Sequence, residues 1–328
     1  MVEVGINAAP LAAARTGVGR YIAGLLDALG KLRPEGIHAR PLFLPGAPAR
    51  GLRALVRRLP GAYEVAEAVR AAALDREHLQ RGLSVYHETN HAAPRFAGKT
   101  VLTVHDLSTV LHPGTQDQAR ARYFSRLLHE RARHAARVIV PSAAIAREVR
   151  EHLHATRVTV IPHGVDAIFT PGAGPRRDFL LFVGAIDPRK GVETLLAAAG
   201  EREVVLAGPL PAFPLAKNVR ATGYVSDEEL LKLYRECAAL VFPSHYEGFG
   251  FPLLEAMACG TPVVASDDPA LVELSQGVAA HFQRGSVESL RAALQRLPDG
   301  SKGPARAAEF TWARCAAAHA QVYRGVAA

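Results

Sequence analysis

Residues 238–266 read AALVFPSHYEGFGFPLLEAMACGTPVVAS and determine the class of fold. The apolar run Ala238–Phe242 predicts a buried strand. A loop with two glycines follows, and Pro252 stands where a helix would begin, because its fixed φ and missing N–H suit the first turn. A second apolar run, Pro262–Ala265, predicts the next strand. A strand, a loop, a helix and another strand in this order are typical of a parallel sheet covered by helices.

The same alternation of short apolar runs and helical segments extends along the whole chain. The other predicted strands are Val2–Asn7, Ala39–Leu44, Leu83–Tyr86, Thr100–Val104, Arg137–Val140, Val158–Ile161, Phe179–Val183 and Glu203–Ala207. The predicted helices include Val18–Leu29, Gln118–His134, Val192–Ala199, Ser226–Arg235 and Pro252–Ala258. This pattern predicts an α/β protein with two Rossmann-like, doubly wound parallel-sheet domains that face a cleft. The Pro- and Gly-rich segment Thr170–Arg177 is the expected linker between them.

Length and composition agree with a soluble protein of two domains. The chain has 328 residues, of which 49% are hydrophobic and 21% charged, and a domain usually takes about 100–200 residues. No run of 18 apolar residues is present, so no membrane-spanning helix is expected. The beginning of the chain lacks the pattern of a signal peptide, and Cys237, Cys259 and Cys315 lack metal-ligand spacing. We therefore expect a cytoplasmic protein with reduced, buried thiols.

Positive charge is concentrated in the first half of the chain. Residues 1–170 hold 23 Lys and Arg against 14 Asp and Glu, whereas residues 171–328 hold 16 against 17. The basic half is expected to face anionic lipid, nucleic acid or a phosphorylated substrate, unless it is only a solvated Arg-rich surface. Nucleic acid is the weakest of these partners, because no recognised binding module or run of stacking aromatic residues accompanies the charge.

Residues 50–59, RGLRALVRRL, predict a basic amphipathic helix. Its apolar residues recur at helical spacing, and its arginines occupy the other faces. Such a helix suits weak contact with an anionic membrane surface. The same pattern also suits a surface helix whose apolar side packs on the core of its own domain.

Glu247 and Glu255 are the first candidate site residues. Glu247 falls in the loop that precedes the predicted helix, and Glu255 is expected on the first turn of that helix. The free N–H groups at a helix N-terminus favour an anion. Glu255 could then accept hydrogen bonds from vicinal hydroxyls such as those of ribose, or it could only complement the helix dipole.

Arg189 and Lys190 lie between a predicted strand and the N-terminus of the next helix, in the segment FVGAIDPRKG. Two cations at this end of a helix oppose its dipole. They fit a site shared with a polyanion, because an Arg fork and a Lys point charge suit a diphosphate. The alternative is a turn that points into water.

Two further segments follow predicted strands. Gly17 and Gly19, in RTGVGRY, open the first helix and could bring backbone close to a phosphate or sugar, or could only form a tight turn. His105 and Asp106, in TVHDLS, could hydrogen-bond a substrate and accept a proton; the alternative for the histidine is a structural role.

Two observations argue against a metal site. HETNH at residues 87–91 matches a zinc-protease pattern, but that chemistry needs both histidines on one face of a helix. Here the segment is expected to form a loop after a strand. In addition, no D-x-D pair occurs in the chain, so the carboxylate clamp of a metal–diphosphate complex is missing.

Taken together, these pieces resemble the retaining glycosyltransferases of family 4, which have the GT-B fold. The resemblance rests on TGVGRY, VYHETNHAAP, TVHDLS, VIVPS, VIPHGVD, FVGAIDPRKG and EGFGFPLLEAMACGTPVVAS, in this order. It implies an acceptor-side domain over residues 1–170, a sugar-nucleotide domain over residues 171–309, and a last helix over residues 310–328 that crosses back to the first domain. It also implies a nucleoside-diphosphate sugar as co-substrate, with no cofactor and no metal.

The resemblance assigns a role to each candidate residue. Glu255 would bind ribose and Glu247 the donor sugar. Arg189 and Lys190 would hold the diphosphate and stabilise its charge as it leaves. The remaining implied contacts are the backbone of Phe249 and Gly250 with sugar or phosphate, Gly17 and Gly19 with the diphosphate, His105 with the sugar near the reacting centre, and Asp106 on the acceptor side.

One departure from the family pattern selects a branch. Many members carry an Arg immediately after the glycine that ends the strand, but here Gly184 is followed by Ala185. Arg189 would then supply the guanidinium. The shorter segment resembles mannosyl- and rhamnosyltransferases of bacterial surface polysaccharide assembly, whose acceptors include saccharides and lipid-linked saccharides at the cytoplasmic membrane face. The expected donor is similar to GDP-mannose, with UDP- and ADP-sugars as alternatives. A sugar-nucleotide epimerase and a non-catalytic binding subunit on the same fold are the other functions compatible with these residues.

Overall fold

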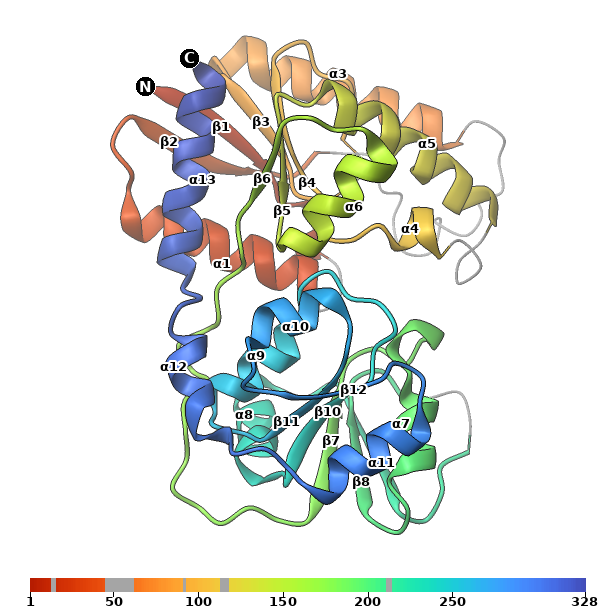
Figure 1. Cartoon of the computed structure of the whole chain (residues 1–328). Helices are drawn as coiled ribbons and strands as arrows, with labels where there is room; N and C mark the ends of the chain where they lie inside the picture. The colour runs from red at the N-terminus through yellow and green to blue at the C-terminus, as the bar shows by residue number, and fades with distance from the viewer. Residues whose placement is uncertain (13–15, 45–61, 91–92, 113–117, 211–213) are drawn as a thin grey trace.

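The computed structural model describes residues 1–12, 16–44, 62–90, 93–112, 118–210 and 214–328. The chain forms two parallel six-stranded sheets, each with helices on both faces (Figure 1). The α/β prediction is therefore confirmed. The predicted basic helix at residues 50–59 lies outside the described ranges. Among the residues that the structure describes, no helix combines the length and apolar character that crossing a bilayer requires.

The first sheet has the strand order β2-β1-β3-β4-β5-β6. Its strands are β1 (Val2–Asn7), β2 (Ile37–Leu42), β3 (Val85–Glu88), β4 (Lys99–Thr103), β5 (Arg137–Val140) and β6 (Val158–Val160). Its helices are α1 (Gly17–Leu32), α3 (Ala62–Arg81), α4 (Ser108–Leu111), α5 (Gln118–His134) and α6 (Ala143–Leu153), with a 3₁₀ turn, η1 (Ala9–Ala12), before α1. Alternate residues of the central strands point to opposite faces, so that Val101 packs towards α1 and Leu102 towards α5 and α6.

The second sheet has the order β12-β11-β10-β7-β8-β9. Its strands are β7 (Phe179–Val183), β8 (Glu203–Ala207), β9 (Val219–Gly223), β10 (Ala239–Phe242), β11 (Val263–Ser266) and β12 (Ala280–Phe282). Its helical elements are η3 (Pro188–Lys190), α7 (Val192–Ala198), α8 (Asp227–Glu236), α9 (Phe251–Ala258), α10 (Pro269–Ser275), α11 (Val287–Gln295), η4 (Gly300–Lys302) and α12 (Gly303–Ala307). One buried cluster lies on each face of this sheet.

The two edge strands of the second sheet, β9 and β12, are not among the strands predicted from the sequence. An edge strand has one neighbour and stays partly exposed, so it needs no continuous apolar run. Val219–Gly223 reads VRATG and is nowhere fully buried, and Ala280–Phe282 has only three residues. Apolar runs therefore identified the central strands and left the edges undetected.

The HETNH segment at residues 87–91 also differs from its prediction. The predicted loop is wrong at its start, because β3 continues through His87 and Glu88. His87 is fully buried, and its two ring nitrogens lie 2.7 Å from the hydroxyls of Tyr323 and Thr103. Asn7 and Tyr86 both donate to Glu88, each at 2.7 Å. The side chains of His87 and Glu88 are therefore held by hydrogen bonds inside the first domain.

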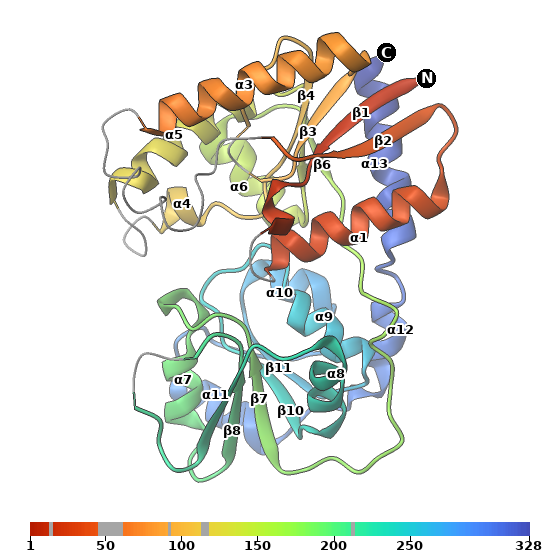
Figure 2. The same ribbon diagram turned by 180° about the vertical axis from the view of Figure 1, so that it is seen from behind.

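The last helix, α13 (Trp312–Ala327), packs on the first sheet (Figures 1 and 2). Cys315, Ala316 and Tyr323 share a buried cluster with residues of α1 and β1. The Tyr21 hydroxyl lies 2.9 Å from Nε2 of His319, which adds a buried polar contact between α1 and α13. The chain therefore crosses between the two sheets twice, once before β7 and once before α13.

The topology brings particular loops to the space between the sheets. In a doubly wound sheet, ligands bind beyond the carboxyl ends of the strands, where the strand order reverses. The order reverses between β1 and β3 in the first sheet, and between β7 and β10 in the second. The loops that follow β1, β7 and β10 are those of the motifs identified from the sequence.

Candidate functional site

A cavity of about 730 Å³ lies between the two sheets. It is lined by residues from both, including the loop before α1, the loop after β4, and the loops after β7 and β10. All ten candidate residues lie on its wall: Gly17, Gly19, His105, Asp106, Arg189, Lys190, Glu247, Phe249, Gly250 and Glu255. The fold thus joins side chains that are up to 238 positions apart in the sequence.

The loop after β7 presents Arg189 and Lys190 from the short turn η3. Asp187 caps this turn by accepting a hydrogen bond from the Arg189 N–H at 2.9 Å, and its other oxygen lies 3.3 Å from the Arg189 guanidinium. Gly191 ends the turn at φ 61°. A Cβ at Gly191 would collide with the Pro243 carbonyl, so only glycine fits between these two loops.

Lys190 joins the loop after β7 to the loop after β10. Its ammonium lies 2.5 Å from Oε1 of Glu247, and the Ser244 hydroxyl donates to the same oxygen at 2.7 Å. The ammonium also lies 5.8 Å from the centre of the Phe242 ring. Both side chains are mostly buried, with 18% of Lys190 and 10% of Glu247 exposed. The pair is therefore held rigidly at the wall of the cavity.

Glu255 lies on the second turn of α9, rather than on the expected first turn. Its side chain is 2% exposed. One oxygen accepts a hydrogen bond from the Tyr234 hydroxyl at 2.9 Å, and the other pairs with the guanidinium of Arg20. A carboxylate on the second turn contributes little to dipole compensation, so the helix dipole does not explain the burial of Glu255 at the cavity wall.

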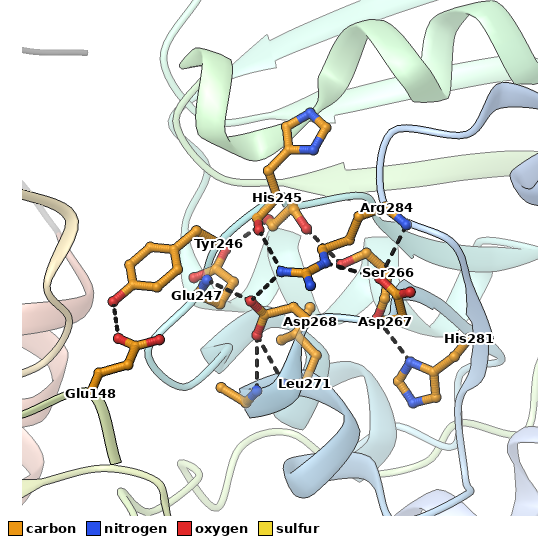
Figure 3. Close-up of polar contacts among 12 residues, drawn as sticks. Glu148, His245, Tyr246, Glu247, Ser266, Asp267, Asp268, Leu271, His281 and Arg284 are labelled. Atoms are coloured by element: carbon orange, nitrogen blue, oxygen red, sulfur yellow. Dashed lines mark hydrogen bonds and ion pairs between the residues drawn. The ribbon is translucent and has the colours of Figure 1, made fainter. Parts of the chain in front are cut away.

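Asp268 hydrogen-bonds to the backbone of the loop that carries Glu247 (Figure 3). Its carboxylate accepts hydrogen bonds from the N–H groups of Glu247 at 3.3 Å and Ala270 at 2.9 Å, and so also caps α10. Arg284 adds a guanidinium nitrogen at 3.8 Å. The pKa of Asp268 is raised to about 6, chiefly by burial and also by the negative charge of Glu247, against the opposing effect of the backbone hydrogen bonds.

The first sheet contributes the opposite wall. α1 begins at Gly17, and the Thr16 hydroxyl accepts a hydrogen bond from the Gly19 N–H at 3.1 Å. His105 lies in the loop after β4, with Nε2 2.9 Å from the Thr89 carbonyl oxygen. Asp106 accepts a hydrogen bond from the Ser108 N–H at 2.8 Å. Both residues are partly exposed where they line the cavity.

Histidine and aromatic rings pack against one another beside these groups. The His163 ring stacks on Phe251 with centroids 5.2 Å apart and lies 5.4 Å from the His105 ring. Burial lowers the pKa of His163 well below its usual value, so this imidazole is neutral and packs as an aromatic side chain. The Tyr21 ring meets the His105 ring edge-on at 5.0 Å and fixes its plane.

Arg20 also lines the cavity, although the motif RTGVGRY by itself predicts no role for it. From α1 it reaches across the cavity to Glu255 and, at 3.0 Å, to Asp227 on α8. Asp166, on the segment that leads to the second sheet, lies 3.8 Å away. The sequence holds no signal for this contact, since these partners are 146 to 235 positions away from Arg20.

The described residues contain no cluster of three or more His, Cys, Asp or Glu side chains that could hold a metal ion. His91 of the HETNH pattern lies outside the described ranges. The charged groups on the cavity wall are Arg20, Arg189 and Lys190, the carboxylates that pair with them, and Asp106. These three cations, with the helix N-termini of α1 and α9, are suited to bind an anionic ligand.

Two family models together match almost the whole chain. The model described as "Glycosyltransferase Family 4" matches residues 15–168, and the model described as "Glycosyl transferases group 1" matches residues 168–311. The boundary between the matches falls in the segment that joins the two sheets.

Named relatives agree with these models. O-antigen chain mannosyltransferase B of Escherichia coli is 27% identical over 289 residues, which cover 73% of this chain and 74% of that protein. The MMP α-(1→4)-mannosyltransferase of Mycolicibacterium hassiacum is 33% identical over 269 residues, which cover 66% of this chain and 64% of that protein.

Solved structures share the fold. Sucrose-phosphate synthase from Thermosynechococcus elongatus superimposes with a TM-score of 0.82 at 23% identity, over 99% of both chains. HepE of Anabaena, solved in complex with UDP-glucose, gives 0.70 at 17% identity over 99% of this chain and 100% of its own. Both family models, the mannosyltransferase relatives and the two facing sheets lead to one conclusion: this chain belongs to the family 4 glycosyltransferases and has the GT-B fold.

Proposed function

We propose that this glycosyltransferase moves a hexose from a nucleoside-diphosphate sugar to a saccharide or lipid-linked saccharide, without a metal ion and with retention of anomeric configuration. The observation that carries the proposal is the arrangement of Arg189, Lys190, Glu247 and Glu255 in one cavity. The two cations suit the diphosphate of such a donor. The partly buried acid, Glu247, suits its sugar, and the fully buried acid, Glu255, suits its ribose.

In this proposal the ribose hydroxyls donate to Glu255 and the sugar hydroxyls to Glu247. The diphosphate lies between Arg189 and Lys190, near Gly17 and the N-terminus of α1. Each cation is already held by a carboxylate, Asp187 or Glu247. An ammonium has three N–H donors, so Lys190 keeps its bond to Glu247 while it binds phosphate. Cations fixed in advance stabilise the leaving charge without reorganisation.

The transfer breaks the bond between the sugar C1 and the β-phosphate oxygen, and it forms a bond from C1 to the acceptor hydroxyl oxygen. The acceptor proton passes to the departing phosphate, on the same face of the sugar, so the configuration at C1 is retained. His105 hydrogen-bonds the sugar near C1, and Asp106 faces the acceptor. The backbone at Phe249 and Gly250 completes the donor site.

A mannose donor similar to GDP-mannose is favoured, because two relatives are named mannosyltransferases. UDP- and ADP-sugars are the alternatives. The first test is thermal stability with GDP, UDP, ADP, dTDP and their sugars, in EDTA. A ligand at about 100 times its Kd adds about 2.7 kcal/mol, so one nucleotide should raise Tm by several degrees. A folded sample that no nucleotide stabilises would contradict the donor site and favour a non-catalytic binding subunit.

Turnover separates this proposal from the epimerase alternative. A transferase releases nucleoside diphosphate only when a saccharide acceptor is present, and its product retains the anomeric configuration of the donor by NMR. An epimerase would convert the sugar nucleotide without an acceptor. Chelation by EDTA should leave the rate unchanged; a rate that falls and recovers with added metal would overturn the metal-free part.

The lipid-linked acceptor is supported by the excess of Lys and Arg in residues 1–170. Each basic residue near an anionic bilayer contributes about 1 kcal/mol, so we propose weak peripheral contact with the inner face of the cell membrane. Flotation with anionic vesicles at low salt tests it, with neutral vesicles as the control. Equal recovery with both would argue for a soluble saccharide acceptor.

A further inference from the structure

Tyr246 lies in a loop of the second domain, but its side chain packs in the core of the first domain. It follows β10 and immediately precedes Glu247. Its ring is buried, with 5% exposed, in the cluster formed by Leu107, Ile145 and their neighbours in the first domain. The His112 ring lies 4.9 Å away. Tyr246 therefore extends from the loop that carries Glu247 into the core of the opposite domain.

The Tyr246 hydroxyl makes two hydrogen bonds in that domain. It donates to Oε2 of Glu148 on α6 at 2.6 Å, and it accepts from the Leu107 N–H at 2.8 Å (Figure 3 shows the first). Burial raises the pKa of Tyr246 far above its usual value, so the hydroxyl keeps its proton. The donor and acceptor capacities of the phenol oxygen are both used across the domain boundary.

The residue on the other side of Glu247 is also held by the first domain. The Ser142 hydroxyl donates to the Gly248 carbonyl at 3.0 Å. A Cβ on Gly248 would overlap the carbonyl oxygen of His105, so the two loops lie in direct backbone contact. Tyr246 and Gly248 thus fix the segment that contains Glu247 against the loop that contains His105.

Glu247 itself faces its own domain. Its N–H donates to Asp268 and its carboxylate binds Lys190 and Ser244. Tyr246 and Gly248 therefore bond to the first domain, whereas Glu247 between them bonds to the second domain. The position of Glu247 relative to His105 depends on the two residues that flank it.

We propose that Tyr246 is a positioning residue, which sets the His105–Leu107 loop in register with Glu247 when the two domains meet. The inference rests on the proposed function, because it assigns the donor sugar to Glu247 and the reacting centre to His105. Transfer requires C1 and the acceptor oxygen at reacting distance, and a small misplacement of either loop lowers the rate strongly. Tyr246 itself lies in the domain boundary and acts through these neighbours.

The test is Tyr246→Phe, which keeps the ring in its apolar cluster and removes both hydrogen bonds. We expect kcat to fall at least tenfold, while the dissociation constant for the nucleoside diphosphate stays within twofold. The side chains proposed to bind the nucleoside diphosphate, Arg189, Lys190 and Glu255, all belong to the second domain, whereas the Tyr246 hydroxyl bonds to the first domain. A kcat within twofold of wild type would overturn the proposal. So would a dissociation constant that weakens as much as kcat falls.

Tyr86→Phe is the matched control. Tyr86 is also a buried tyrosine that donates to a carboxylate, Glu88, at 2.7 Å, but both residues belong to the first sheet. It should lower Tm by about as much as Tyr246→Phe and leave kcat within twofold. An equal loss of kcat in the two variants would mean that general stability, and not registration of the loops, controls the rate.

Glu148 provides a second check by a different residue. Glu148→Gln keeps an acceptor for the hydroxyl and should keep most of kcat, whereas Glu148→Ala should lower kcat. In Tyr246→Phe combined with Glu148→Ala, the second change should add little, because one interaction has already been lost. If the double variant instead loses kcat by the product of the two single losses, the two residues act independently, which would contradict the proposal.

Failure of the proposed function can be told apart from failure of this inference. A wild-type protein that binds no nucleoside diphosphate contradicts the donor site. Small-angle scattering then tests the contact alone. Tyr246→Phe should increase the radius of gyration relative to wild type and Tyr86→Phe, since the domains separate more readily. An unchanged radius would overturn the inference without reference to any substrate.

Discussion

The guanidinium of Arg20, from α1 of the first domain, pairs with the carboxylate of Glu255, the most deeply buried acid of the cavity in the second domain. Asp227 and Asp166 add their oxygens at 3.0 and 3.8 Å. The Arg20 guanidinium therefore pairs with three carboxylates, which come from α8, α9 and the segment between the sheets. This contact fixes the spacing of the two domains beside the proposed ribose site.

Removing Arg20 should destabilise the protein measurably. In Arg20→Ala, Glu255 stays buried with its hydrogen bond from Tyr234, and a buried polar group that loses a partner costs about 1–3 kcal/mol. Urea unfolding should show a loss of this size. Lys31→Ala, which breaks an exposed pair with Asp27, should change stability by less than about 1 kcal/mol. Equal effects from the two variants would contradict the structural importance of Arg20.

Arg189→Ala should reduce turnover much more than folding stability. If the guanidinium stabilises the departing diphosphate, its loss should lower kcat at least tenfold, which corresponds to about 1.4 kcal/mol of transition-state stabilisation. Steady-state kinetics with the donor that the stability panel identifies will measure it. Arg202→Ala is the control, since Arg202 also pairs with an aspartate, Asp178, outside the cavity. A loss below threefold in Arg189→Ala would refute the assigned role.

Asp268 should make stability depend on pH between about 4 and 6. Because burial raises the pKa to about 6 from 3.8, the folded protein binds more protons than the unfolded chain in this range. The free energy of unfolding therefore decreases as pH rises. At 1.36 kcal/mol per pKa unit, the decrease is about 3 kcal/mol. Asp268→Asn should remove this contribution and so flatten the curve relative to wild type, whereas Asp267→Asn at the exposed neighbour should retain it. Parallel curves for wild type and Asp268→Asn would disprove the shift.

Gly248→Ala should separate the two loops. Its Cβ would overlap the His105 carbonyl, and backbone cannot give way as a side chain can. We expect kcat to fall at least tenfold with a lower Tm. Gly30→Ala, in α1 with open space around it, should leave kcat unchanged and raise stability by up to about 1 kcal/mol. Full activity in Gly248→Ala would show that the loops separate during the reaction.

The three cysteines should be unreactive in the folded protein. Burial raises the pKa of Cys237, Cys259 and Cys315 each to about 12, so almost no thiolate exists at pH 8. A chromogenic disulfide reagent should label none of them within minutes in buffer and all three in guanidinium chloride. Rapid labelling of one thiol in native protein would reveal local opening at that residue.

The sequence predicted the central strands and the cavity wall well, for a physical reason. Apolar runs such as Phe179–Val183 must be buried on both faces, and the loops after parallel strands meet at one sheet edge. His105, Arg189 and Glu247 could therefore be assigned to a common cleft from their positions after strands. The family resemblance supplied their roles, which stay predictions until tested.

The contacts between the domains could not be predicted in this way. Arg20, Tyr246 and Asp268 all stand inside or beside quoted motifs, yet their partners are set by how two separate sheets meet. Tyr246 illustrates the difficulty, because an aromatic residue after a strand is ordinarily expected to fill the core of its own domain. The edge strands β9 and β12 escaped for a different reason, since partial exposure removes the apolar pattern.

The docking of α13 on α1 also has a consequence for how the chain is made. A ribosome synthesises β1–β6 before the second sheet, but the buried cluster of the first sheet includes Cys315, Ala316 and Tyr323, which are translated more than 150 residues after β6. The second sheet has all its strands once Phe282 has been added. The domain that begins the chain therefore completes its core last, and its nascent form must keep an apolar face covered or shielded until α13 arrives.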